Sequence, residues 1–293
     1  MPMTESISLE HEPPRGAPSR TLGLLGAKGG VGTTVLASSL AWALAQRGQQ
    51  VVLLDFDLQQ GQAALHLCER NAGPTVREAL ELIDRLDDTL LDTLLTPCSP
   101  GLRLLPAPRV WWWGAADGVN LLKLLRTAQA LGDWIVVDLP HTAPTQDSGR
   151  TLLQHLDDVV LVTEPTLPAT FNAQRAWLEL ERTRGPGRHS LVLNKTHRQH
   201  ALPIDQVLRT LGLDDHAESW REMPRSEAAV AQATYQGQAV GAVDPRDPLA
   251  RALSRWAADL VSHASEGQDM VPPPLETEAP RALWRERLMR WAS

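Results

Sequence analysis

A glycine-rich run near the start of the chain has the residue types and spacing of a phosphate-binding loop. The run reads Gly26-Ala27-Lys28-Gly29-Gly30-Val31-Gly32-Thr33-Thr34. Glycines let backbone amides turn toward phosphate oxygens without a Cβ in the way, and the N-terminus of a following helix adds partial positive charge. The hydroxyl of Thr34 is suited to ligate Mg²⁺. The expected chemistry is the binding of a nucleoside polyphosphate with its metal, and an ordinary tight turn is the alternative.

Acidic residues follow two of the apolar runs. Asp55 and Asp57 come at the end of one run, and Asp138 comes near the end of another. Carboxylates at a strand end beside a terminal phosphate can orient an attacking water and help to hold Mg²⁺. The sequence alone does not decide which of Asp55 and Asp57 does which, and we place Asp57 nearer the water. The alternative is that the paired aspartates only form the turn after the strand.

The apolar patterning indicates the elements that must position these groups. Six runs have strand length: Leu22 to Leu25, Val51 to Leu54, Leu102 to Leu105, Trp134 to Val137, Val159 to Val162 and Leu191 to Leu193. They alternate with longer helical patterns such as Thr34 to Gln46 and Phe171 to Glu181. Continuously apolar strands are buried on both faces, as in a parallel sheet covered by helices. We predict an α/β fold with a doubly wound, mostly parallel sheet whose ligand lies across the C-terminal ends of the strands.

Length and composition predict one large domain with tails. The 293 residues are 43% hydrophobic and 22% charged, which is enough to bury one full-sized core. The expected parts are a disordered leader (1–20), the nucleotide-binding domain (21–263), a proline-rich acidic linker (264–280) and a basic amphipathic tail helix (281–293). The leader lacks the apolar stretch of a signal peptide, and no run reaches the roughly 20 apolar residues that span a bilayer. We expect a cytoplasmic protein.

The charged and sulfur-containing residues exclude some classes of partner. The net charge of −7 and the pI near 5.7 argue against a nucleic-acid partner, since such proteins usually present a basic face. Cys68 and Cys98 belong to no C-x-x-C or Cys/His cluster, so we expect two reduced, ordinary cysteines and no structural zinc. Only three of the 28 basic residues are lysines: Lys28, Lys123 and Lys195. A lysine kept in an arginine-rich chain points to chemistry that requires a compact ammonium group.

The segment Lys28-Gly29-Gly30-Val31-Gly32 resembles the deviant Walker A motif of the MinD/ParA family of ATPases. In that family an early signature lysine crosses the dimer interface to the partner's ATP, and the loop usually continues with a second lysine. Here Thr33 stands in place of that second lysine. The resemblance implies ATP and Mg²⁺ as cofactors and a homodimer with ATP. Loss of one ammonium group from the phosphate site implies weak or slow ATP hydrolysis.

Further motifs of the family imply the site residues. Asp55 and Asp57 resemble its switch motif, and Asp138 ends a strand similar to Walker B. Asn194 matches the adenine-recognition strand, and Pro224 matches the segment beside the base. An asparagine can donate and accept on a base edge, although it is also an ordinary turn former at strand ends. The implied catalytic residues are Lys28, Asp55 and Asp57. The implied nucleotide contacts are Lys28, Gly29, Gly30, Val31, Gly32, Thr33, Thr34, Asn194 and Pro224. The implied Mg²⁺ ligands are Thr34, Asp57 and Asp138.

Two branches of the family share the lysine-to-threonine change: the CpaE/TadZ ATPases of Flp-type pilus assembly and the BcsQ proteins of bacterial cellulose secretion. The segment Glu164-Pro165-Thr166 resembles the CpaE/TadZ branch more than BcsQ. The resemblance implies an ATP-dependent dimer that positions a Flp (Tad) type pilus or secretion machine, in the cytoplasm or peripherally at the inner membrane or cell pole. The alternatives are a BcsQ-like role in cellulose export, a ParA-like partition ATPase and a nucleotide-independent scaffold.

Two aromatic features lie outside these motifs. The run Trp111-Trp112-Trp113 cannot turn all its indoles to one face of a helix or strand, so a partner contact and packing on the core are equally open. The tail places Trp284, Leu288 and Trp291 on one face, with arginines around them. Such a helix suits an anionic membrane surface or a groove on a partner, and docking on its own domain is the alternative.

Overall fold

The computed structural model describes residues 18–68, 73–110, 116–183, 187–198, 202–214 and 219–265. The chain divides into two units, Met1–Ala257 and Ala258–Ser293, and the features below belong to the first unit except for the end of α11. The tryptophan run, the predicted leader up to residue 17, and the predicted linker and tail beyond residue 265 lie outside the described residues.

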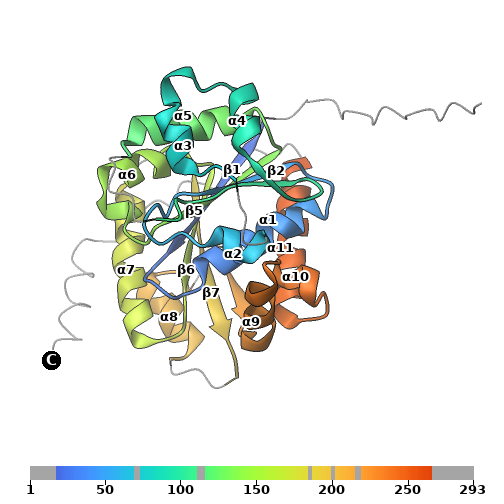
Figure 1. The fold of residues 1–293 in the computed structure, drawn as a ribbon. Helices are drawn as coiled ribbons and strands as arrows, with labels where there is room; N and C mark the ends of the chain where they lie inside the picture. Colours follow the sequence, from blue (N-terminus) through green and yellow to red (C-terminus); the bar gives the residue numbers. More distant parts are fainter. Residues whose placement is uncertain are drawn as a thin grey trace, which may run out of the picture. The chain divides into compact units, whose positions relative to one another are not determined.

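Eight strands of the described chain form one sheet. They are β1 (Arg20–Gly26), β2 (Val51–Asp55), β3 (Thr96–Ser99), β4 (Leu102–Leu105), β5 (Trp134–Leu139), β6 (Asp158–Thr163), β7 (Arg188–Thr196) and β8 (Trp220–Pro224). Their order is β3-β4-β2-β5-β1-β6-β7-β8, and every neighbouring pair is parallel except β3 with β4. The predicted α/β fold with a mostly parallel sheet is confirmed, and Figure 1 shows helices on both sides of the sheet.

Helices make most of the connections. The α-helices are α1 (Thr33–Ala45), α2 (Ala63–Leu67), α3 (Val76–Glu81), α4 (Asp88–Leu94), α5 (Gly118–Gln129), α6 (Asp147–Leu153), α7 (Leu167–Arg182), α8 (Ile204–Leu211), α9 (Glu227–Gln236), α10 (Val240–Val243) and α11 (Pro248–Ser265). Within the described residues, the complete 3₁₀ turns are η1 (Ile83–Arg85) and η2 (Ala143–Thr145). Helix α1 packs on β1, β2 and β5 with α2 and α10 beside it, whereas α7 packs on β6 next to α8. Among the described residues, no helix has the length and apolar character needed to cross a membrane.

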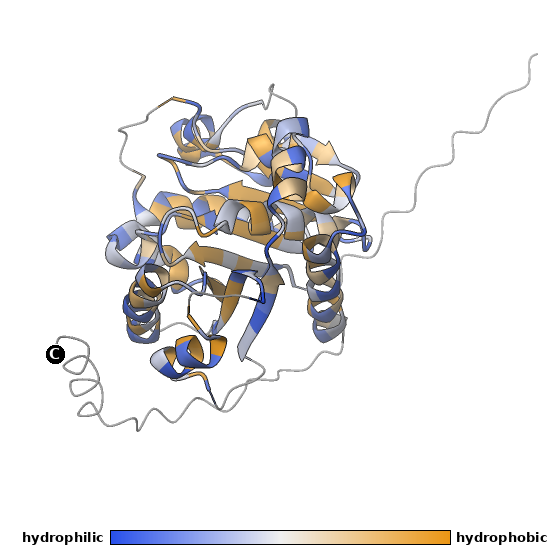
Figure 2. Cartoon of the chain, turned by 90° about the horizontal axis from the view of Figure 1, so that it is seen from below, coloured by the Kyte–Doolittle hydropathy of each residue, from blue (hydrophilic) through white to orange (hydrophobic). Residues whose placement is uncertain are grey.

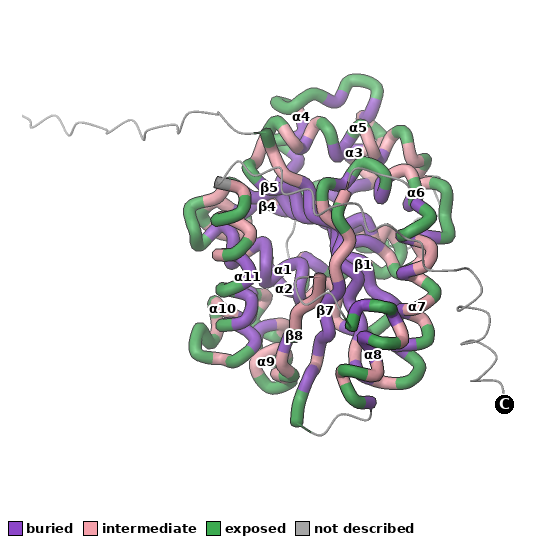
Figure 3. The backbone as a smooth tube through the Cα atoms, turned by 180° about the vertical axis from the view of Figure 1, so that it is seen from behind, coloured by how far each residue is buried: buried purple, intermediate pink, exposed green. Residues whose placement is uncertain are grey.

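The central strands are buried on both faces. Every residue of β2 and β5 is buried. Because successive strand side chains point to opposite faces, Val52 and Leu54 join the core with Leu124 of α5, while Leu53 faces α1. Figure 2 shows the apolar colour concentrated on the strands, and Figure 3 shows the same strands buried beneath helices with exposed outer turns. This double burial explains why the strands read as continuous apolar runs.

The sheet order brings the chemically active residues to one edge. Strand β1 lies between β5 and β6, and it leads into the glycine-rich loop. Asp55, Asp138, Glu164 and Asn194 lie at or just beyond the C-terminal ends of β2, β5, β6 and β7. Parallel strands end on the same edge, and open α/β sheets bind ligands outside that edge. The fold therefore gathers these residues around the loop.

The predicted strands and helices are present, but the edges of the sheet were not predicted. All six predicted runs lie within observed strands, and the predicted helices coincide with α1 and α7 to within a few residues. Strands β3 and β8 carry no continuous apolar run, and β3 contains Pro97. An edge strand has one hydrogen-bonded neighbour and buries less, so its sequence is free of the pattern on which strand prediction depends.

The two cysteines form a disulfide, so the expectation of two reduced, unconnected cysteines is wrong for this structure. Cys68 follows α2 and Cys98 lies in β3, with their Cα atoms 5.5 Å apart, which is within the usual range for a disulfide. They are 30 positions apart in the sequence, and only the return of the chain to the sheet edge as β3 brings them together. No spacing rule signals a pairing of this kind.

The Cys68–Cys98 link predicts a stability difference. Replacing Cys98 by serine removes a cross-link between residues 30 positions apart, so we expect the free energy of unfolding under oxidising conditions to fall by about 3 kcal/mol. Urea unfolding with and without dithiothreitol measures this difference. The reductant should lower the parent to the level of Cys98→Ser and leave the variant unchanged; a parent indifferent to reductant would mean that the link is not formed in solution.

Candidate nucleotide-binding site

The glycine-rich loop joins β1 to α1 in a conformation that requires glycine at two positions. Gly30 and Gly32 have φ angles of 81° and 91°, in the region that favours glycine. A Cβ on Gly32 would lie 2.6 Å from Asn194 Nδ2. Gly32 is also the N-cap of α1, where no side chain caps the first turn. The backbone amides at this helix start are therefore left for an anion.

The end of β7 holds the loop from one side. The buried Asn194 donates from Nδ2 to the carbonyl oxygen of Val31 at 2.7 Å. Lys195 donates from Nζ to the carbonyl oxygen of Gly30 at 2.6 Å. Pro224 ends β8, the strand that pairs with β7. The two residues expected beside the base, Asn194 and Pro224, thus lie on neighbouring strands.

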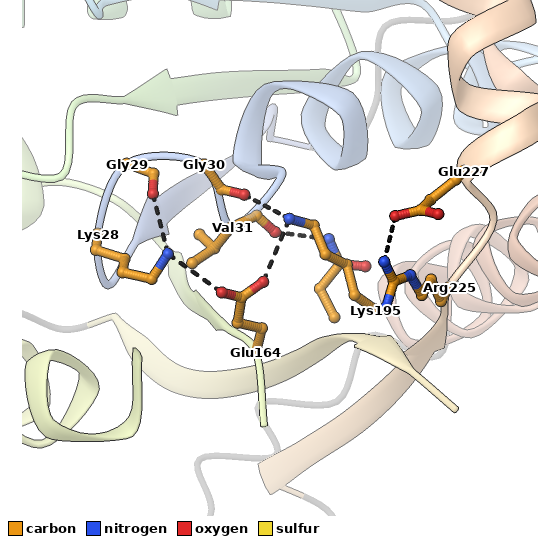
Figure 4. Close-up of polar contacts among 9 residues, drawn as sticks. Lys28, Gly29, Gly30, Val31, Glu164, Lys195, Arg225 and Glu227 are labelled. Carbon is orange, nitrogen blue, oxygen red and sulfur yellow. Dashed lines mark hydrogen bonds and ion pairs between the residues drawn. The ribbon is translucent and has the colours of Figure 1, made fainter. Parts of the chain in front are cut away.

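A carboxylate bridges two lysines beside the loop. Glu164 Oε1 lies 3.2 Å from Lys28 Nζ, and Glu164 Oε2 lies 3.2 Å from Lys195 Nζ. Lys28 Nζ also donates to the carbonyl oxygen of Gly29 at 3.2 Å. Figure 4 shows the three charged side chains pointing toward one another from three different segments. Partial burial tends to raise the pKa of Glu164, but the two ammonium groups outweigh burial and hold that pKa below its usual value.

Two buried aspartates lie side by side at the ends of β2 and β5. Asp55 and Asp138 are register partners and are each 1% exposed. Asp55 accepts hydrogen bonds from the backbone nitrogens of Ala63 at 3.0 Å and Asp57 at 3.3 Å. Burial raises the pKa of Asp55 to about 7, against the effect of these hydrogen bonds. Burial and the neighbouring charge of Asp55 raise the pKa of Asp138 well above its usual value, and a hydrogen bond with the Thr34 side chain opposes them.

The oxygen atoms around Asp138 fit a magnesium ion. Asp138 Oδ2 is buried and has no hydrogen-bond partner, and the Thr34 hydroxyl is next to this carboxylate. Mg²⁺ prefers such oxygens and usually takes its other ligands from water and substrate phosphates. Within the described ranges no three His, Cys, Asp or Glu side chains converge on one point. Asp57, the third expected ligand, is partly exposed and accepts a hydrogen bond from the Gln60 backbone at 3.0 Å.

Two residues of this site received no role from the sequence, namely Glu164 and Lys195. Lys195 carried one signal, because it is among the few lysines of an arginine-rich chain. Glu164 carried only its resemblance to a branch of the family. Their contact with Lys28 depends on how β6 and β7 end beside the loop, which no spacing along the chain reveals.

The buried aspartate pair predicts a pH-dependent stability without magnesium. A carboxyl whose pKa is raised by folding, as that of Asp55 is to about 7, destabilises the folded state increasingly as the pH rises from about 4 through about 7. Asp138→Asn removes one charge of the pair. We expect it to raise the free energy of unfolding by on the order of 1 kcal/mol at pH 8 and by less at pH 5. Urea unfolding in EDTA at both pH values measures this.

Asp147→Asn is the matched control for this measurement. The Asp147 side chain is fully exposed, so removal of its charge should change the free energy of unfolding little at either pH. An equal effect of Asp138→Asn at pH 5 and pH 8 would contradict the raised pKa.

The chain is similar to known P-loop NTPases in sequence. The sequence model of the ParA family, described as NUBPL iron-transfer P-loop NTPase, matches residues 18–186. The septum site-determining protein MinD of Synechocystis is 28% identical over 193 residues, covering 65% of this chain and 69% of that protein. Other MinD relatives, from Escherichia coli and Thermotoga maritima, are matched over 57% and 53% of their own lengths.

Solved structures share the fold. A ParA family ATPase from Chlorobium tepidum has a TM-score of 0.73 and 26% identity, covering 83% of this chain and 99% of that chain. MinD from Pyrococcus horikoshii, complexed with Mg-ADP, has a TM-score of 0.71 and 18% identity, covering 86% of this chain and 100% of that chain. The second likeness shows the fold alone. Because the family match spans more than half of the residues, the chain belongs to the ParA family of P-loop NTPases, of the MinD/ParA type.

Proposed function

We propose that the chain is an ATP-dependent switch that binds Mg-ATP at the glycine-rich loop and dimerises through Lys28. The observation that carries this proposal is the position of Lys28 at the rim of the loop. Its side chain is 31% exposed, and its ammonium group is held by Glu164 and the Gly29 carbonyl. A second copy can therefore approach it. The resemblance of the loop to the deviant Walker A motif supports the same role.

The loop and the end of β7 supply the nucleotide contacts in this proposal. The amides of residues 29–34 bind the phosphates, because the start of α1 has no side-chain cap. Asn194 binds the adenine edge, and Pro224 lies beside the base on the next strand. Because Asn194 also holds the loop carbonyl of Val31, binding of the base and shaping of the phosphate site use the same side chain.

The ends of β2 and β5 carry the residues that we place at the metal and at the terminal phosphate. Thr34, Asp138 and Asp57 would hold Mg²⁺, which neutralises phosphate charge when it is bound. Asp55 holds the backbone of Ala63 and of Asp57, so it determines the path of the segment that carries Asp57. Asp57 is partly exposed and is the residue we place at the attacking water. A cation held by Asp138 would lower the repulsion on neighbouring Asp55 and would thereby stabilise this segment.

Slow hydrolysis is expected because of Thr33. A Cβ on Gly26 would lie 2.6 Å from Thr33 Oγ1, so this hydroxyl lies close against β1. A hydroxyl brings no charge to the β- and γ-phosphates, where a lysine ammonium would stabilise the transition state. ATP then acts mainly as a switch ligand, which shifts the monomer–dimer equilibrium through contacts that differ between the two states.

The partner we propose is a pilus or secretion machine of the Flp (Tad) type. The segment Glu164-Pro165-Thr166 after β6 supports this branch through its resemblance to CpaE/TadZ proteins. Thr33 is shared with BcsQ proteins and supports a second candidate, the localisation of cellulose secretion. The names of the relatives, septum site-determining MinD among them, are consistent with a role in positioning.

Sedimentation analysis tests the switch. We expect a dimer with Mg-ATP and a monomer with Mg-ADP or without nucleotide. Lys28→Ala should weaken dimerisation with Mg-ATP by at least about tenfold, because it removes a charge-assisted contact across the interface. Lys123→Ala is the matched control, since Lys123 lies on α5 and donates to the carbonyl of Ile83. The same mass in all three conditions would favour the nucleotide-independent scaffold.

The effect of Thr33 on turnover is testable by restoring the lysine. We expect Thr33→Lys to raise the rate of Mg-ATP hydrolysis by about tenfold or more, because it adds an ammonium group at the transferred phosphate. Thr89→Lys adds the same charge on the exposed surface of α4 and should leave the rate unchanged. Hydrolysis by Thr33→Lys no faster than by the parent would show that this position does not limit turnover.

A further inference from the structure

Lysine is scarce in this chain, and two of its three lysines meet on one carboxylate. Lys28 and Lys195 each lie 3.2 Å from an oxygen of Glu164. The third lysine, Lys123, lies on α5. Lys28 belongs to the loop motif, whereas Lys195 lies on β7 and has no role in the proposal above. Its position against the loop therefore requires an explanation.

The backbone of Lys195 adopts a conformation that brings its side chain to the loop. Its φ angle is 56°, and it is the one described non-glycine residue with positive φ. In an extended strand, successive side chains point to opposite faces. Here Asn194 and Lys195 both contact the loop, at Val31 and Gly30. Backbone conformations of this kind are uncommon for residues with a Cβ and gather at ligand sites, where surrounding contacts enforce them.

The loop carries one ammonium group fewer than the motif that it resembles. Thr33 contributes a hydroxyl in place of an ammonium group, and a polyphosphate carries several negative charges even with one Mg²⁺ bound. Lys195 Nζ already lies 2.6 Å from the carbonyl oxygen of Gly30, within the phosphate loop. The flexible four-carbon stem of a lysine lets its ammonium group change position by side-chain rotation.

We propose that Lys195 is a phosphate-binding residue that supplies the ammonium group missing at Thr33, and that Glu164 holds it beside the loop until a polyphosphate arrives. The Lys195 side chain is 41% exposed and that of Glu164 is 16% exposed. The Lys195 ammonium group can thus exchange Glu164 for a ligand, while the carboxylate keeps its ion pair with Lys28. A polyphosphate competes well for it, since charge-assisted hydrogen bonds to phosphate oxygens are strong.

The net charge beside the loop depends on Lys195. Lys28, Glu164 and Lys195 together carry one net positive charge beside the loop. Without Lys195 the cluster is neutral, and the remaining carboxylate repels an incoming phosphate at short range. Neutralising Glu164 has the opposite effect, because neither ammonium group then forms an ion pair with a carboxylate.

Calorimetric titration of the full chain with Mg-ATP, Mg-ADP and AMP tests the inference, which rests on the proposed binding of ATP at the loop. Lys195→Met keeps the apolar stem and removes the charge. We expect it to weaken Mg-ATP by about tenfold, Mg-ADP by a similar or smaller factor and AMP by less than about twofold. Lys123→Met is the matched control and should bind all three as the parent does. Thermal melts check that each variant is folded.

Two further variants test the charge without relying on one substitution. Adding Thr33→Lys to Lys195→Met should restore Mg-ATP affinity to within about threefold of the parent, because the ammonium group returns from the loop itself. Glu164→Gln should tighten Mg-ATP several-fold, since it removes the competing carboxylate.

The outcomes separate the inference from the proposed function. Lys195→Met binding Mg-ATP as tightly as the parent would overturn the inference alone. An equal loss for AMP and Mg-ATP would also overturn it, because the side chain would then act on the base or on the fold. Weaker binding of Mg-ATP by Glu164→Gln would contradict the holding role of Glu164. A parent chain that binds no Mg-ATP would overturn the proposed function, and the inference with it.

Discussion

A phosphate-binding loop must leave its amides free, so its shape depends on the residues around it. In this chain β6 and β7 provide that support. The backbone of Ala27 donates to the carbonyl of Val162 at 2.8 Å. Asn194 and Lys195 donate to the loop carbonyls of Val31 and Gly30. The parallel order β1-β6-β7 is what places these groups within reach. The phosphate site therefore depends on register across three strands as much as on its own glycines.

The buried aspartates make the site costly to maintain without a cation. Asp55 and Asp138 face each other across adjacent strands, and burial is the largest cause of the raised pKa of each. Asp55 recovers part of this cost through backbone hydrogen bonds from Ala63, Asp57 and Ala107, whereas Asp138 Oδ2 has no hydrogen-bond partner. An orphaned carboxylate oxygen at a strand end is unfavourable in a structural role and suitable in a metal-binding one. The repulsion between the two buried carboxylates therefore affects both the stability of the fold and the affinity for a cation, and both depend on pH.

The sequence predicted the central fold well because double burial leaves a direct pattern, as the run from Val51 to Leu54 shows. It predicted neither edge strand, nor the pairing of Cys68 with Cys98, since both depend on where the chain returns. At the site, glycine spacing and terminal aspartates indicated a phosphate loop and its metal. The bridge from Glu164 to two lysines was not predictable, because it joins three segments distant in sequence through a left-handed residue on β7.

Contacts outside the sheet link the two sides of the candidate site, at the ends of β2 and β8. Asp55 binds the amide of Ala63, the first residue of α2, and His66 of this helix lies 3.2 Å from the Thr234 hydroxyl in α9. Burial lowers the pKa of His66, so a neutral imidazole makes this contact at neutral pH. Helix α9 follows Pro224 and β8, which pairs with β7. Residues at the end of β2 and at the end of β8, on the two sides of the candidate site, are thus connected through the packed helices α2 and α9.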